Sequence, residues 1–139
     1  ILSEGEKSGI LPESIEKERK TGARQRKSFS DSWQAGLKMV FGTDAAVYPH
    51  GNNTKQLSRM VRFGMTPMQA LQVATIEGAK LLNQTENIGS LTANRYADII
   101  AVKGDPIGDI TLLEDIDFIM KGGLVYKNKS NESILNSLK

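Results

Sequence analysis

The spacing of apolar residues changes along the chain near residue 83. Before that point a charged opening segment and one short apolar run at residues 37–41 are followed, from about residue 53, by apolar positions at helical intervals. That run is interrupted only by Lys38, a pattern typical of a strand buried on both faces. After residue 83, short apolar runs alternate with glycine, aspartate and asparagine, which indicates strands and turns. The pattern therefore predicts a helix–strand–helix–helix first part and a β-rich second part.

The first part opens with a highly charged segment. Pro12 and the glutamates after it favour the start of a helix that is polar nearly all round, and a second helical stretch is expected from Ser30 to Gly36. The run from Lys17 to Lys27 is basic, but glutamates dilute it and no aromatic residues interleave with it. We interpret it as a solvated helix face. RNA binding through this run is a weaker alternative, which salt-dependent RNA binding would support.

Two helix-start signals follow the strand. Asn53, with Gln56 three residues later, predicts a capping box. Thr66 with Gln69 predicts a second capping box, and Pro67 suits the first turn of the helix that begins there. The second of these helices carries a broad apolar face and is expected to continue to about residue 83.

The second part contains three strand-like runs, at residues 88–91, 97–102 and 118–126. The last run includes Gly122-Gly123, a two-residue hairpin signal between apolar stretches. The loop between the last two runs is marked by Asp105-Pro106 and Gly108-Asp109. A meander of short strands is therefore expected, followed by a polar tail.

Composition excludes several classes. The chain has 139 residues, enough for one domain with a core, and its net charge of +2 gives no general case for nucleic acid or a membrane surface. It has no cysteine, which excludes disulfides and thiolate–metal sites. The first residues show no secretory pattern, so a cytoplasmic location is favoured although the location stays unknown. Because Ile1 is not methionine, we expect a processed chain or a piece of a longer one.

Two residues near the first strand are candidates for chemistry. Asp44 ends the strand, and reactive groups of α/β folds lie at the carboxyl ends of parallel strands. It could bind a divalent metal or act as a general base, although an aspartate in this position more often serves a turn or a cap. His50 is the only histidine and lies in a loop. It could be a ligand, a proton shuttle or a substrate contact, or simply a loop residue.

A complete metal site is not expected from this chain alone. A catalytic zinc site usually has three protein ligands and an open position, and this chain offers a single histidine. Asp98 precedes an apolar run, where a carboxylate more often bonds the amides of a turn than a metal. Tyr48, Asn52 and Asn53 could bond a substrate, and capping explains Asn53 equally well.

Four segments carry a family resemblance: FGTDAAVYPHGNN, MTPMQALQVATIEGAKLL, IGSLTANRYADIIAVKGDP and DFIMKGGLVYKN. In this order they resemble the C-terminal third of the amidohydrolase superfamily. Within it they are similar to the imidazolonepropionase-like peptidases, which include Xaa-Pro dipeptidases and zinc carboxypeptidases that remove arginine or lysine. One small departure is Asn94 or Arg95 where a turn glycine is usual, and asparagine tolerates the left-handed geometry.

The resemblance implies an α/β fold, namely the C-terminal part of a (β/α)8 barrel together with strands of a small β-sandwich. Residues 1–84 would form the last helices and strand of the barrel, with residues 37–43 as the eighth strand. Residues 85–128 would form the C-terminal sandwich strands, and residues 129–139 a tail. An incomplete barrel would expose its inner strand faces, so we expect an oligomer or a companion chain.

The resemblance also implies an activity, the hydrolysis of peptide C–N bonds by metal-activated water. Asp44 would bind one or two divalent ions, expected to be zinc, and carry a proton from the attacking water to the leaving amine. His50 would lie near the substrate. The other metal ligands should lie upstream, so the isolated chain is expected to be inactive. The alternative is a truncated, non-catalytic module that binds a partner chain.

Overall fold

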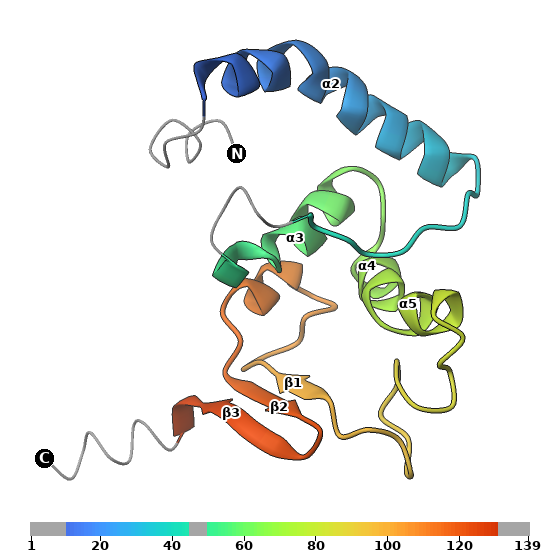
Figure 1. Ribbon diagram of the computed structural model, residues 1–139, viewed down its shortest axis with the longest axis vertical. Coiled ribbons are helices and arrows are strands. Elements are labelled where there is room, and N and C mark those ends of the chain that lie inside the picture. Colours follow the sequence, from blue (N-terminus) through green and yellow to red (C-terminus); the bar gives the residue numbers. More distant parts are fainter. Residues whose placement is uncertain (1–10, 45–49, 131–139) are drawn as a thin grey trace, which may run out of the picture.

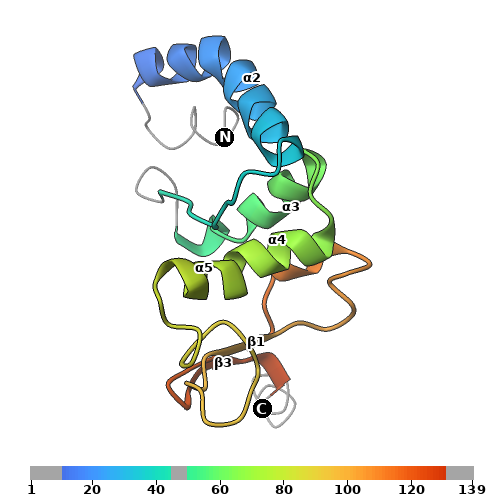
Figure 2. The same cartoon turned by 90° about the vertical axis from the view of Figure 1, so that its right-hand side faces the viewer.

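The computed structural model describes residues 11–44 and 50–130 (Figure 1). In chain order the elements are α2 (Pro12–Gln34), η1 (His50–Asn52), α3 (Lys55–Arg62), α4 (Pro67–Ala74), α5 (Ile76–Leu81), β1 (Ile99–Ala101), η2 (Ile110–Glu114), β2 (Phe118–Lys121) and β3 (Leu124–Asn128). Figures 1 and 2 both show α2 at one end, the sheet at the other, and the short helices α3 to α5 between them. None of the helices in the described ranges has the length and apolar character that a membrane crossing requires.

A single helix, α2, replaces the two helical stretches expected at the start. It begins with proline in its first turn, as predicted, and runs without a break for 23 residues. Phe29 and Trp33, one turn apart near the C-terminal end of this helix, pack against the core. It ends before Gly36, whose φ of +75° is the left-handed conformation expected of a helix stop.

Residues 37–43 form no strand in the described part of the chain, so the prediction of a regular strand is wrong for this chain by itself. Phe41 N–H donates a hydrogen bond to the Val73 carbonyl of α4 at 3.0 Å. Leu37 and Val40 remain 56% and 39% exposed. An apolar strand needs neighbours that take its backbone hydrogen bonds and cover its faces, and no strand of this chain lies beside the segment among the described residues.

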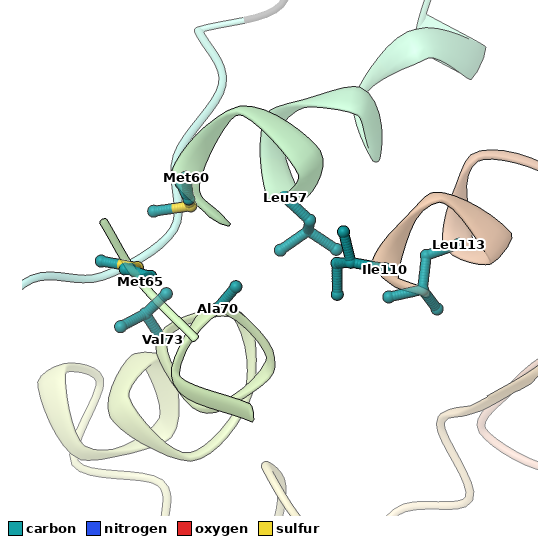
Figure 3. Close-up of a cluster of buried hydrophobic side chains, with 7 residues drawn as sticks. All are labelled: Leu57, Met60, Met65, Ala70, Val73, Ile110 and Leu113. Atoms are coloured by element: carbon teal, nitrogen blue, oxygen red, sulfur yellow. The ribbon is translucent and has the colours of Figure 1, made fainter. Parts of the chain in front are cut away.

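The core lies between the short helices. Its buried residues come from α3, α4, η2 and the turn between α3 and α4; they are Leu57, Met60, Met65, Ala70, Val73, Ile110 and Leu113. Figure 3 shows Leu57 pointing from α3 toward Ile110 and Leu113 of η2. The loop before β2 is therefore pinned to the helices, and the helical and β-rich parts share one core.

The predicted capping box at Thr66 is confirmed. Gln69 N–H donates to Thr66 Oγ1 at 3.3 Å, and Thr66 N–H donates to Gln69 Oε1 at 2.8 Å. The helix that follows does not continue to residue 83 as expected, because it breaks at Thr75 into α4 and α5. The Thr75 hydroxyl donates to the Leu71 carbonyl at 2.7 Å, a side-chain bond that competes with the helical ladder.

The sheet is an antiparallel meander in the order β1-β2-β3, with Ile99 opposite Met120 and Ile119 opposite Lys127. Gly122 and Gly123 form the predicted hairpin turn with φ of +56° and +80°, the signs that a type I′ turn requires. The run expected as a strand at residues 88–91 is instead irregular. There Gly89 lies so close to α5 that an added Cβ would be 2.7 Å from that of Ala79.

Candidate functional site

Asp44 follows the irregular segment of residues 37–43, and its side chain is exposed. Its backbone has a φ of +46°, the left-handed region in which aspartate and asparagine are enriched among non-glycine residues. Met39 and Phe41 of the same segment pack against the helical core. The exposed carboxylate therefore follows a segment whose side chains Met39 and Phe41 contact the core.

His50 opens the 3-10 helix η1, which leads into α3. The structure describes its backbone, whereas its side chain and Tyr48 lie outside the described part. Because α3 contributes Leu57 and Met60 to the core, the residues on both sides of the connection from Asp44 to α3 are fixed to the same cluster. The roles of Asp44 and His50 remain predictions.

Asn53 does not form the predicted capping box. The N-cap residue of α3 is Thr54, in a helical conformation and without a side-chain cap. Gln56 N–H instead donates to the backbone carbonyl of Asn53 at 3.1 Å. The side-chain oxygen Oδ1 of Asn53 is buried and accepts no hydrogen bond.

No three histidine, cysteine, aspartate or glutamate side chains come together as a metal site within residues 11–44 and 50–130. Asp98 takes the turn role favoured from sequence: its Oδ1 accepts a hydrogen bond of 2.7 Å from Gly122 N–H in the hairpin. Asp44 is thus not part of a cluster of three or more such side chains among the described residues. A single carboxylate cannot make a metal site alone.

A groove of about 410 Å3 borders the segment that leads to Asp44. Trp33 and Leu37 supply apolar lining, and Lys38, Gln72 and Glu77 supply polar lining. Asp44 is not among the lining residues. The groove therefore marks the uncovered side of the unpaired segment and not a cleft built around the candidate carboxylate.

An ionic cluster that was not predicted from the sequence connects the segment before β2 with residues that follow β1 and β3. Lys129 Nζ lies 2.5 Å from Asp115 Oδ2 and 3.3 Å from Asp117 Oδ1, and Asp117 Oδ2 accepts from Lys103 N–H at 2.8 Å. The hydrogen bond from Lys129 lowers the pKa of Asp115, and the backbone hydrogen bond from Lys103 is the main cause of the lowered pKa of Asp117. The sequence contains two matching patterns of opposite charge, Asp115-x-Asp117 and Lys127-x-Lys129, which could have suggested the cluster. Only the strand register, however, brings these residues together.

Residues 3–127 match the profile of the amidohydrolase family, and the chain belongs to that family. It is similar to a crystal structure of an Xaa-Pro dipeptidase with methionine bound in the active site, with 40% sequence identity and a TM-score of 0.80. That match covers 91% of this chain and 31% of the dipeptidase chain. The fold class predicted from the motifs, part of an amidohydrolase fold, is therefore confirmed.

Two curated relatives widen the comparison. Ochratoxinase of Aspergillus niger is 30% identical over 132 residues, which are 91% of this chain and 27% of that protein. Imidazolonepropionase of Flavobacterium johnsoniae is 34% identical over 73 residues, 50% of this chain and 18% of that protein. The chain thus spans less than a third of each of these three proteins, and it shares with them a hydrolase family acting on amide and other C–N bonds.

Proposed function

We propose that this chain forms the C-terminal part of a metal-dependent amidohydrolase that hydrolyses peptide C–N bonds, with Xaa-Pro dipeptides as the substrate class. The observation that carries the proposal is the similarity to the Xaa-Pro dipeptidase, at 40% identity and a TM-score of 0.80 over 91% of the chain. Peptides ending in arginine or lysine are the second substrate class, as the sequence motifs imply. The relation to ochratoxinase adds ochratoxin to the compounds to be assayed.

In the proposed enzyme Asp44 supplies one ligand to a divalent ion, zinc in our proposal, and one or two ions are bound. The ion, when bound, supplies a Lewis acid that favours deprotonation of water near neutral pH. Asp44 accepts a proton from the attacking water and gives it to the leaving amine, which departs readily only when protonated. The exposed position of Asp44 at the end of an anchored segment supports this role, because the carboxylate is accessible to water and substrate.

The remaining ligands and the rest of the barrel belong, in this proposal, to sequence outside the chain. Residues 37–43 then become the last barrel strand, residues 1–84 the end of the barrel and residues 85–128 the last strands of a small β-sandwich, with residues 129–139 as a tail. The exposure of Leu37 and Val40 supports this arrangement, since a neighbouring strand would cover them. His50 lies on the substrate side.

The test is an assay of the complete polypeptide that contains this chain, purified with and without a chelator. We expect hydrolysis of Xaa-Pro dipeptides that the chelator abolishes and zinc restores, whereas the isolated 139-residue chain should hydrolyse nothing. Asp44→Asn should lower kcat by orders of magnitude while the circular dichroism spectrum is retained. Near-normal kcat in that variant would refute the role of Asp44. An inactive complete polypeptide that binds a partner chain would support the non-catalytic alternative.

A further inference from the structure

A backbone hydrogen bond joins the segment before Asp44 to α4. Phe41 N–H donates to the Val73 carbonyl at 3.0 Å. The backbone groups of residues 38–40, just before it, have no backbone hydrogen-bond partner among the described residues. The bond to Val73 therefore anchors, three residues before Asp44, a segment that no strand of the described chain holds.

The acceptor of this bond is available because α4 ends close to it. The last four carbonyls of an α-helix have no partner within the helix, and Val73 is the next-to-last residue of α4. Val73 is buried, with 3% exposure, and a carbonyl left without a donor at a buried position is costly. Phe41 N–H supplies the donor. The point at which α4 ends therefore decides whether the segment before Asp44 is held.

Thr75 is the residue at which α4 ends. Its hydroxyl donates to the Leu71 carbonyl at 2.7 Å, and its N–H donates to the Gln72 carbonyl, three residues back, at 3.2 Å. Its φ of −127° and ψ of −90° lie outside the helical region. The helical ladder is therefore interrupted at this residue, and α5 begins at Ile76.

The hydroxyl bond does not break a helix by itself. Thr21 makes the same bond, to the Lys17 carbonyl at 2.8 Å, and α2 continues through it. Thr75 has a second contact, because the backbone at Gly89 lies so close that an added Cβ would be 3.3 Å from the Thr75 carbonyl oxygen. The loop after α5 thus packs against the break, and the two contacts act on the same residue.

We propose that Thr75 is a positioning residue for Asp44. By ending α4 it leaves the Val73 carbonyl to Phe41 N–H, and that bond fixes the segment from which the carboxylate extends. Asp44 has a φ of +46°, a conformation that non-glycine residues keep only where the surrounding structure enforces it. The catalytic consequence rests on the proposed function, whereas the hydrogen bond does not.

Hydrogen–deuterium exchange of the Phe41 amide in the complete polypeptide tests the bond. We expect this amide to be protected in wild type and to exchange about threefold to tenfold faster in Thr75→Ala. Alanine is the best helix former, so the ladder can continue through residue 75 and Glu77 N–H can take the Val73 carbonyl. Thr75→Ser keeps a hydroxyl and should retain the protection. Thr21→Ala removes the matched hydroxyl from α2 and should also retain it.

Two results of the exchange experiment overturn the proposal. An unprotected Phe41 amide in folded wild type does so whether or not the variants fold. Equal protection in wild type and folded Thr75→Ala does so as well, because the amide then bonds elsewhere or α4 ends for another reason.

In the same polypeptide we expect Thr75→Ala to lower kcat by about tenfold to a hundredfold, the cost of a misplaced catalytic group, with KM nearly unchanged. Thr75→Ser should recover most of kcat, and Thr21→Ala should leave it unchanged. A folded Thr75→Ala enzyme with wild-type kcat overturns the positioning role. A wild-type protein that hydrolyses no amide instead refutes the proposed function, and the exchange of the Phe41 amide still decides the hydrogen bond.

Discussion

The contact between α3 and η2 gives the sharpest test of the fold. Leu57 is 5% exposed and points toward Ile110 and Leu113 (Figure 3). Leu57→Ala removes most of a buried leucine side chain, whose burial is worth about 1.5–3 kcal/mol, and leaves a cavity that adds to the loss. Since helices on one side and a short 3-10 turn on the other can relax only partly, we expect a total loss of about 2–4 kcal/mol.

The assay is urea unfolding of the isolated chain followed by far-ultraviolet circular dichroism. Leu81→Ala is the matched control, because Leu81 is 70% exposed at the end of α5 and the same atoms are removed. We expect the control to change the free energy of unfolding by less than about 0.5 kcal/mol. Equal losses in the two variants, or a loss below about 1 kcal/mol in Leu57→Ala, would show that α3 and η2 do not share a core in solution.

Three further predictions follow from the same structure. Gly89→Ala should lower the midpoint of thermal unfolding, because the new Cβ would lie 2.7 Å from that of Ala79 and the φ of +91° disfavours alanine; an unchanged midpoint would contradict the close packing. In the ionic cluster, folding depresses the pKa values of Asp115 and Asp117, so their contribution is present above the unfolded pKa of 3.8 and is lost as pH falls through the folded values. The pKa of Lys129 is raised, so its contribution is present below 10.5 and is lost at more alkaline pH. Melting curves of wild type and Asp115→Asn should therefore converge in acid, and a constant gap between them would contradict the linkage. Finally, light scattering should find the isolated chain in oligomers, because large apolar side chains such as Leu37, Leu81 and Leu91 are exposed among the described residues; a monodisperse monomer at high concentration would refute this expectation.

Signals that act over a few residues were readable from sequence. The capping box at Thr66 depends on Gln69 three positions later, and the hairpin depends on two adjacent glycines. Asp98 was expected to bond the amides of a turn and does so at Gly122. Asn94 was expected to tolerate left-handed geometry and has a φ of +69°. In each case the local structure depends on hydrogen-bonding groups or backbone conformations of the motif itself or of the turn that it contacts.

The failures involve partners that lie far away in sequence. α2 is anchored at its C-terminal end because Phe29 and Trp33 pack against the core, which no local pattern reveals. Asparagine is a residue type that often caps helices, but Asn53 does not cap α3, since Thr54 takes the N-cap position. At Thr75, where the helix breaks, the side-chain hydroxyl donates to the Leu71 carbonyl and so competes with the backbone N–H groups of the helical ladder, and propensity alone does not settle such a competition.

The unpaired segment before Asp44 connects the fold to the proposed chemistry. Its backbone lacks a strand neighbour in the described chain, and its terminal carboxylate lacks companion ligands there. In the proposed hydrolase the same flanking strands would supply both, because ligands of a barrel site project from the ends of adjacent strands. Strand pairing and metal binding are then linked equilibria: an ion that binds only the completed site stabilises it by mass action. Zinc should therefore raise the midpoint of thermal unfolding of the complete polypeptide and leave that of the isolated chain unchanged, and an equal rise in both would show that the ion binds elsewhere on this chain.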